Sequence, residues 1–263
     1  MSFETANGTA YTIEGDGAPV LLVHGMGLNR HMWNWQLPPL AGRFKTVRYD
    51  LLGHGDSVKR PGPYVLSDFV DQITELLDHL DLNRCALVGF SLGGMIVRAA
   101  AVAHPNRVSA LAILNSPHDR GEAERAAMLT RLDLALQHGP QSTIDAALAR
   151  WFTDAFAEKR PDVLTQIREW MNANDPDIYP EIYRVLATGD AEIAESIASI
   201  RCPTLVLACG EDHGNSPDMA RRMAALIPGA EASIIPTLKH MGLAEDPDAI
   251  SGVLVPFLEE ALA

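Results

Sequence analysis

Short apolar runs alternate with longer helical patterns through the first half of the chain, and this alternation strongly limits the possible folds. The apolar runs are Val20–Val23, Thr46–Tyr49, Cys85–Val88 and Leu111–Leu114, and helix-like segments lie near Met32–Ala41, Ser67–Leu80 and Leu92–His104. Strands that are apolar throughout and separated by helices are typical of a parallel sheet with helices on both faces. The sequence therefore predicts an α/β fold.

The alternation stops near Ser116 and resumes at Thr204–Ala208. Between residues 119 and 200 the pattern is helical, interrupted by prolines, and predicts about four or five helices and no strand. A helix (Pro217–Leu226), a strand (Ala232–Ile235) and a helix (Pro247–Leu262) are expected to complete the chain. We therefore expect residues 1–118 and 201–263 to form one core, and residues 119–200 to form a helical cap, or lid, inserted into it.

The charge balance narrows the classes of partner. Among 263 residues, 21 Lys and Arg oppose 34 Asp and Glu, which leaves a net charge of −13. A surface this acidic repels phosphate backbones and anionic lipids, so we expect neither a nucleic-acid nor a membrane partner. No apolar stretch approaches the roughly 20 residues of a membrane span, and residues 1–8 are too polar for a signal peptide. Cys85, Cys202 and Cys209 lie in or beside apolar runs without metal-ligand spacing, as in a cytoplasmic protein.

A candidate nucleophile lies where a predicted strand meets a predicted helix. Gly89-Phe90-Ser91-Leu92-Gly93 is a G-x-S-x-G pattern at a strand-to-helix junction, the context in which this pattern carries a nucleophilic serine. The turn is tight, so the residues two positions before and after Ser91 must lack side chains, and both are glycine. Ser91 would then stand at the N-terminus of a helix, where backbone N–H groups can stabilise an oxyanion.

A second glycine-rich turn follows the first predicted parallel strand. His24-Gly25-Met26-Gly27 allows the backbone to turn sharply beside Ser91. The backbone N–H of Met26 would then converge with that of Leu92 on one oxygen atom. Two such donors form an oxyanion hole, and we predict that Met26 and Leu92 provide it.

The base and the acid of a serine nucleophile in this arrangement come from later loops, in the order Ser, Asp or Glu, then His. Of nine histidines, His240 fits best because it follows the last predicted strand and precedes the last helix. The loop after Thr204–Ala208 offers Asp212, which is our choice for the acid, and Glu211, which is the alternative. The acid would fix the tautomer of His240 and stabilise its protonated form.

These motifs, taken in order, resemble the α/β-hydrolase fold family. The resemblance implies a mostly parallel eight-stranded sheet, a Ser-His-Asp triad and a helical cap, and its chemistry needs no metal or cofactor. The segment Arg48–Ser57 and the cap around Trp151 resemble the branch of 3-oxoadipate enol-lactonase. The segment His24–Trp33 is also similar to small carboxylesterases.

The expected function is hydrolysis of a small carboxylic ester or enol-lactone through an acyl-enzyme on Ser91. Serine at this position disfavours haloalkane dehalogenases and epoxide hydrolases, which need a carboxylate nucleophile. Two alternatives stay open. One is hydrolysis of an activated amide or N-acyl enamine of a small dicarboxylate, and the other is a receptor-like protein with little turnover.

The cap is expected to set the specificity. Arg150, Trp151, Trp170 and Arg184 are the candidate substrate-binding residues. A small anionic substrate would need local arginines in so acidic a protein. The sequence leaves open both the identity of the substrate and the oligomeric state, monomer or homodimer.

Overall fold

The computed structural model describes residues 2–263 and contains one eight-stranded sheet. Its strands are β1 (Ser2–Glu4), β2 (Ala10–Glu14), β3 (Pro19–Val23), β4 (Lys45–Tyr49), β5 (Cys85–Phe90), β6 (Val108–Leu114), β7 (Thr204–Cys209) and β8 (Glu231–Ile235). They lie in the order β1-β2-β4-β3-β5-β6-β7-β8. Pairs that involve β1 or β2 are antiparallel and the other pairs are parallel, which confirms the predicted sheet.

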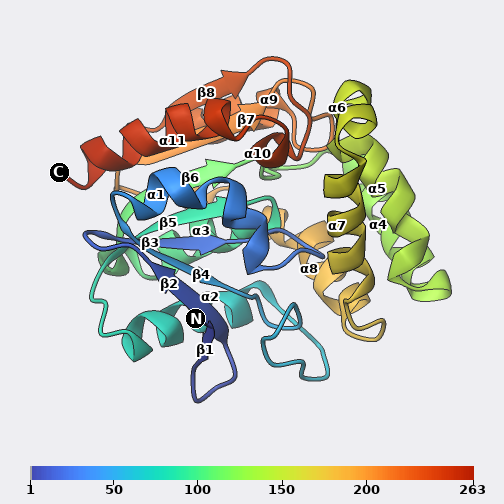
Figure 1. Cartoon of the computed structure of the whole chain (residues 1–263), viewed down its shortest axis with the longest axis horizontal. Helices are drawn as coiled ribbons and strands as arrows, with labels where there is room; N and C mark the ends of the chain where they lie inside the picture. The colour runs from blue at the N-terminus through green and yellow to red at the C-terminus, as the bar shows by residue number, and fades with distance from the viewer. Residues whose placement is uncertain (1) are drawn as a thin grey trace.

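Helices cover both faces of this sheet, which explains why its central strands are apolar throughout. Helices α2 (Leu66–His79), α3 (Leu92–Ala103) and α9 (Pro217–Leu226) pack on the face that carries Leu21 and Val23. Helices α1 (Leu37–Ala41), α10 (Gly242–Glu245) and α11 (Pro247–Ala261) pack on the face that carries Val20 and Leu22. Figure 1 shows α11 and α2 on opposite sides of the strands.

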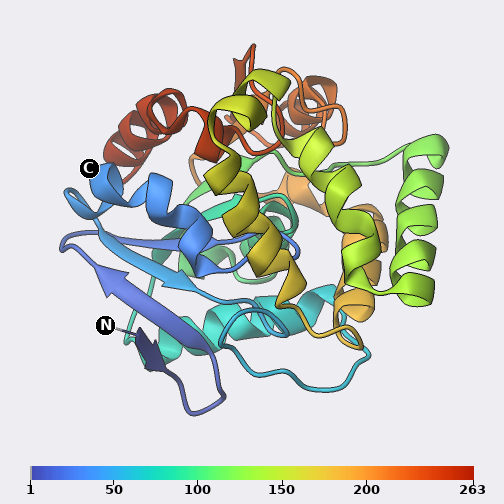
Figure 2. The ribbon, with the colours of Figure 1, turned by 45° about the vertical axis from the view of Figure 1, so that its right-hand side comes forward.

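The chain between β6 and β7 consists of helices. They are α4 (Glu122–His138), α5 (Ile144–Trp151), α6 (Asp154–Lys159), α7 (Pro161–Asn172) and α8 (Tyr179–Glu192). In Figure 1, α4 to α7 stand beyond one end of the sheet, and Figure 2 turns them toward the viewer. Pro161 and Pro180 lie in the first turns of α7 and α8, where the missing N–H removes no helical hydrogen bond.

Two differences from the expected elements have local causes. The helix expected near residues 32–41 is a 3₁₀ helix, Arg30–Trp35, followed by α1, because Pro38 and Pro39 fit only the first turn of a new helix. The strands β1 and β2 had no apolar run to reveal them, since both are short and mix polar with apolar residues, Ser-Phe-Glu and Ala-Tyr-Thr-Ile-Glu. Further 3₁₀ turns are Pro105–Arg107, Pro140–Thr143 and Ser196–Ser199. Within residues 2–263, no helix has the length and apolar character to cross a membrane.

Candidate active site

Ser91 lies on the turn between β5 and α3 with φ 55° and ψ −114°. This left-handed conformation is strained for a residue with a side chain, and such strain gathers at functional sites. A Cβ atom on Gly89 would lie 2.3 Å from the Gly93 carbonyl oxygen, and one on Gly93 would lie 2.2 Å from the Val23 carbonyl oxygen. The turn therefore requires both glycines, and it presents Ser91 at the start of α3.

His240 lies in the loop after β8, against a buried carboxylate. Its Nδ1 donates to Oδ2 of Asp212 at 2.6 Å, and Oδ1 of Asp212 accepts the backbone N–H groups of Gly214 and Asn215 at 3.0 Å each. With Nδ1 donating, the Nε2 atom of His240 is the acceptor of the ring. Glu211 is exposed to solvent, so the structure places Asp212, and not the alternative, beside the histidine.

The ring and backbone of His240 are both held in place. Its ring centroid lies 4.7 Å from that of Phe90 and 5.6 Å from that of Trp151. Its carbonyl oxygen accepts the side-chain N–H of Asn115 at 2.7 Å, and Oδ1 of Asn115 accepts the backbone N–H of Cys209 at 2.8 Å. Asn115 therefore joins the His240 loop to the ends of β6 and β7.

Ser91, Asp212 and His240 line one cavity of about 320 Å³, together with Met26. Its floor is made by loops at the carboxyl ends of parallel strands, which is where ligands bind in open α/β sheets. Its roof is made by side chains of α4, α5, α7 and α8. Among the described residues, no group of three or more His, Cys, Asp or Glu side chains could hold a metal ion.

The predicted oxyanion turn lies directly beside the nucleophile. A Cβ atom on Gly25 would lie 2.9 Å from Cδ1 of Phe90 and 3.2 Å from the Cβ atom of Ser91, so a side chain here would force the Phe90 ring to shift. In the part of the chain that the structure describes, the N–H groups of Met26 and Leu92 are not donors in the hydrogen bonds of turns and loops. Both N–H groups therefore stay candidates for the predicted oxyanion hole.

Two buried histidines hold the oxyanion turn. Nδ1 of His24 donates to the Gly25 carbonyl oxygen at 2.8 Å, and Nε2 of His54 accepts the Gly27 N–H at 3.0 Å. Burial is the main cause that lowers the pKa of His24 to about 4 and the pKa of His54 to about 3. Both rings are thus neutral near pH 7, and each is already engaged in structural hydrogen bonds.

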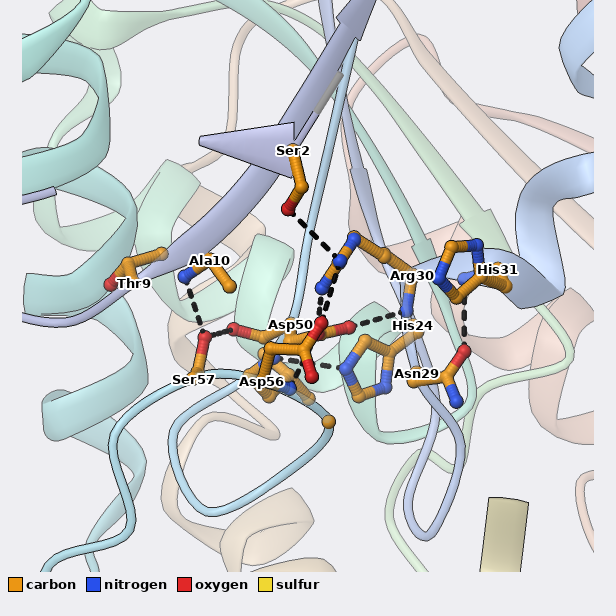
Figure 3. Close-up of polar contacts among 12 residues, drawn as sticks. Ser2, Thr9, Ala10, His24, Asn29, Arg30, His31, Asp50, Asp56 and Ser57 are labelled. Carbon is orange, nitrogen blue, oxygen red and sulfur yellow. Dashed lines mark hydrogen bonds and ion pairs between the residues drawn. The ribbon is translucent and has the colours of Figure 1, made fainter. Parts of the chain in front are cut away.

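A buried ion pair between Arg30 and Asp50 lies next to His24 of the same turn (Figure 3). Asp50 pairs with the guanidinium group of Arg30 and accepts the backbone N–H groups of Arg30 at 2.7 Å and Asp56 at 2.9 Å. Ser57 Oγ donates to the Asp50 carbonyl oxygen at 2.6 Å and accepts the Ala10 N–H at 3.0 Å. These bonds tie the loop after β4 to the loop after β3.

Of the predicted cap residues, Trp170 and Arg184 do not line the cavity, which corrects that expectation. Trp170 packs against Trp35, with ring centroids 6.2 Å apart, and the side chain of Arg184 is 52% exposed. Met171, next to Trp170, and Tyr183, next to Arg184, line the cavity instead.

Arg150 and Trp151 do line the cavity, and Arg131 joins them from α4. Nε of Arg131 donates to the hydroxyl of Tyr183 at 3.3 Å. Partial desolvation, and next the charge of Arg131, lower the pKa of Arg150, as expected for two cations at one wall. Within residues 2–263, neither guanidinium group forms an ion pair with a carboxylate.

Sequence reasoning missed Arg131, because α4 has no single apolar face. Met128, Leu132 and Ala135 are buried, but Leu129, Leu134 and Leu136 of the same helix are exposed. The sequence therefore carries no pattern that shows which side of α4 meets the cavity.

Asn215 is a second residue that sequence reasoning missed. It is 8% exposed, lines the cavity, and its Nδ2 lies 3.4 Å from Nδ1 of His240. Its Oδ1 has no hydrogen-bond partner in the described part of the chain. Buried polar atoms are seldom left unpaired, so Asn215 is an unusual neighbour of His240.

Comparison with known proteins places the chain in a family. A model of the alpha/beta hydrolase fold matches residues 18–247, and the chain belongs to this family. It is 30% identical over 254 residues to (E)-2-((N-methylformamido)methylene)succinate hydrolase of Acinetobacter baylyi, which covers 96% of this chain and 95% of that protein. It is 27% identical over 199 residues to 3-oxoadipate enol-lactonase 2 of the same organism, covering 76% and 73%.

A solved structure agrees with these relatives. The crystal structure of the enol-lactonase from Burkholderia xenovorans LB400 superposes with a TM-score of 0.90 at 28% identity, over 98% of this chain and 100% of that one. The resemblance read from the motifs is confirmed. The chain is a hydrolase of the α/β-hydrolase type.

Proposed function

We propose that this protein is a serine hydrolase that cleaves a small carboxylic ester or enol-lactone through an acyl-enzyme on Ser91. The observation that carries the proposal is one cavity in which Ser91, on its strained turn, and His240, bound to Asp212 at 2.6 Å, are both exposed to a ligand. A nucleophile, a base and an oriented acid at one cavity are the parts that acyl transfer requires.

The reaction proceeds in two halves. In the first, Nε2 of His240 takes the proton of Ser91 Oγ as this oxygen attacks the carbonyl carbon, and the N–H groups of Met26 and Leu92 receive the negative oxygen. The C–O bond to the leaving group then breaks, and His240 passes its proton to the departing alkoxide or enolate. In the second half, His240 takes a proton from water as the water oxygen attacks the acyl carbon. The bond between this carbon and Ser91 Oγ then breaks, and His240 returns the proton to Ser91 Oγ.

The test of the acyl-enzyme uses p-nitrophenyl acetate and a fluorophosphonate probe. The wild-type protein is expected to release a burst of p-nitrophenolate and to take the label, while Ser91→Ala loses the label and about 10³-fold or more of the esterase rate. Ser142→Ala, on an exposed serine of the cap, is the matched control and should behave as wild type. Full esterase activity in Ser91→Ala would rule out the proposal, and a protein without burst or turnover would be the receptor-like alternative.

The substrate carries a carboxylate in this proposal. Arg131 and Arg150 bring two positive charges to the cavity of a chain whose net charge is −13. A guanidinium group binds a carboxylate through charge-assisted, often paired hydrogen bonds, so these two groups suit a carboxylate. One of the two relatives above is named for a succinate derivative and the other for 3-oxoadipate, and both of these compounds are dicarboxylates. These names support a substrate whose acyl group carries a second carboxylate.

Charge reversal at the cavity tests the substrate class. Arg150→Glu is expected to raise KM for an anionic enol-lactone by about tenfold to a hundredfold, since an attraction becomes a repulsion. The same variant should leave KM for neutral p-nitrophenyl acetate unchanged. Arg184→Glu, a reversal on the cap but outside the cavity, is the control. Equal losses on both substrates would contradict a carboxylate subsite without contradicting the hydrolysis itself.

A second candidate is hydrolysis of an activated amide or N-acyl enamine of a small dicarboxylate. The observation that favours it is the 30% identical relative, which is named for such a substrate. Matched lactone and N-acyl enamine substrates of one acid would separate the two. A higher kcat/KM for the enamine would favour this candidate, and a higher kcat/KM for the lactone would contradict it.

A further inference from the structure

Arg98 is a cation buried behind the nucleophile turn, and no step above uses it. Its side chain is fully buried in α3, two turns of helix after Ser91. Burial lowers its pKa to about 9, so the group stays charged near pH 7. Within the described residues it pairs with no carboxylate at ion-pair distance. A buried cation of this kind is costly unless its N–H groups find acceptors.

The acceptors of Arg98 lie on two different elements. Nε donates to the Gly94 carbonyl oxygen at 3.0 Å, in the first turn of α3. Nη2 donates to the Pro117 carbonyl oxygen at 2.6 Å and to Ser116 Oγ at 3.3 Å, and Nη1 lies 3.5 Å from Nδ1 of His118. The guanidinium group therefore joins α3 to residues 115–118, which we call the β6–α4 bridge.

The β6–α4 bridge contacts both the candidate nucleophile and the candidate base. Ser116 Oγ donates to the Ser91 carbonyl oxygen at 2.8 Å, and the Asn115 side chain donates to the His240 carbonyl oxygen at 2.7 Å. The bridge also lies directly on the nucleophile turn, because a Cβ atom on Gly94 would be 2.5 Å from the Cβ atom of Ser116. A shift of the bridge would therefore change the separation of Ser91 and His240.

We propose that Arg98 is a positioning residue for the hydrolysis: it clamps the β6–α4 bridge to α3 and so sets the separation of Ser91 and His240. Proton transfer needs the two side chains within hydrogen-bond reach, and a misplacement of about 1 Å can cost about 100-fold in rate. The planar fork of arginine reaches three acceptors at once, which a lysine or an apolar side chain does not. This inference rests on the proposed serine hydrolase function.

The test compares Arg98→Gln, Arg98→Lys, Ser116→Ala and the double variant Arg98→Gln/Ser116→Ala. For Arg98→Gln, we expect kcat for p-nitrophenyl acetate and the second-order rate of fluorophosphonate inactivation to fall together by about tenfold or more, with KM unchanged. Arg98→Lys should recover part of the loss. Because both residues act through one bridge, the double variant should lose no more than Arg98→Gln alone.

Arg222→Gln is the matched control. Nη2 of Arg222 donates to the carbonyl oxygens of His118 and Asp119 at 3.4 Å each, so it binds the end of the same connection without reaching Ser91 or His240. This variant should keep the wild-type kcat. All rates are measured well below the melting temperature of each variant. If Arg98→Gln does not fold, the same comparison is made with Arg98→Lys, Ser116→Ala and the double variant Arg98→Lys/Ser116→Ala.

Three results would overturn the inference. A lower melting temperature with unchanged kcat and inactivation rate would make Arg98 purely structural. Multiplying losses in the double variant would show that Arg98 and Ser116 act independently. A wild-type protein that does not react with the fluorophosphonate would overturn the proposed function together with the role of Arg98, and this failure is distinguishable because it precedes any substitution.

Discussion

Asp212 and Glu211 are neighbours in the chain, but only one of them meets His240. The backbone N–H of Asp212 donates to the Cys209 carbonyl oxygen at 3.2 Å, in a tight turn at the end of β7. That turn directs the Asp212 side chain inward, where it is 3% exposed, and leaves Glu211 in solvent. Two backbone N–H groups on its second oxygen keep the carboxylate oriented toward the ring.

Asp212→Asn should therefore lower kcat for p-nitrophenyl acetate by about 10³- to 10⁴-fold, because an amide no longer stabilises the tautomer and the protonated form of His240. The measurement is steady-state kinetics at pH 7.5 on protein shown to be folded by circular dichroism. Glu211→Gln is the matched control and should stay within about twofold of wild type. A large loss in the control, or a small one in Asp212→Asn, would contradict the assignment of the acid.

At the scale of elements, one buried ion pair ties the start of the cap to its last long helix. The backbone N–H of Arg120 donates to Asp190 of α8 at 2.9 Å, and the Arg120 guanidinium group lies 3.3 Å from the same carboxylate. The guanidinium group also donates to the Leu186 carbonyl oxygen at 2.8 Å. Asp190 is fully buried and Arg120 is 5% exposed. If one partner were removed, water could not solvate the charge of the other.

Asp190→Ala is expected to lower the free energy of unfolding by about 3 kcal/mol, since it leaves the Arg120 cation buried and unpaired. Glu181→Ala, which removes the partner of the exposed Arg184 from the same helix, should cost less than about 1 kcal/mol. Urea denaturation followed by circular dichroism measures both. Equal effects of the two substitutions would show that the buried pair does not hold the cap in place.

At the scale of the whole molecule, three buried histidines make stability depend on pH. Burial is the first cause that lowers the pKa of His24 and of His118 to about 4 and that of His54 to about 3, against 6.5 for the free side chain. In the unfolded chain these rings take up a proton as the pH falls through 6.5. In the folded protein they stay neutral until about pH 4. Acid therefore favours the unfolded state across this interval.

Stability should accordingly be full above about pH 7 and fall between pH 6.5 and pH 4, by about 2 kcal/mol for each histidine at pH 5. Urea denaturation at half-unit steps of pH measures this, and its slope near pH 5 should correspond to an uptake of about two to three protons on unfolding. His54→Gln should reduce the uptake by about one proton. A stability that is flat between pH 7 and pH 5 would contradict neutral, buried rings.

Much of the fold could be predicted because its signals are periodic or local. The alternation of apolar runs and helical segments predicts the parallel sheet, and the glycines at 89 and 93 predict the turn that lifts Ser91. The position of His240 follows from the order of the strands. Only β1 and β2, which are short and mix polar with apolar residues, carry no such pattern.

The walls of the cavity could be predicted only in part. Arg150 and Trp151 line it, whereas Trp170 and Arg184 do not. No pattern along the chain states which face of a cap helix meets the core. That depends on how the helices pack, which is a contact between segments far apart in sequence.

The sequence by itself thus determined the class of fold and the residues offered as nucleophile and base, since each depends on neighbours within a few positions. The tertiary structure alone decided that Asp212 and not Glu211 meets His240, that Arg131 joins Arg150, and that Arg98 lies behind the Ser91 turn. Each of these is a contact between side chains from different elements. Such contacts depend on how the helices between β6 and β7 pack on the rest of the chain, and the spacing of residues along the sequence does not encode this packing.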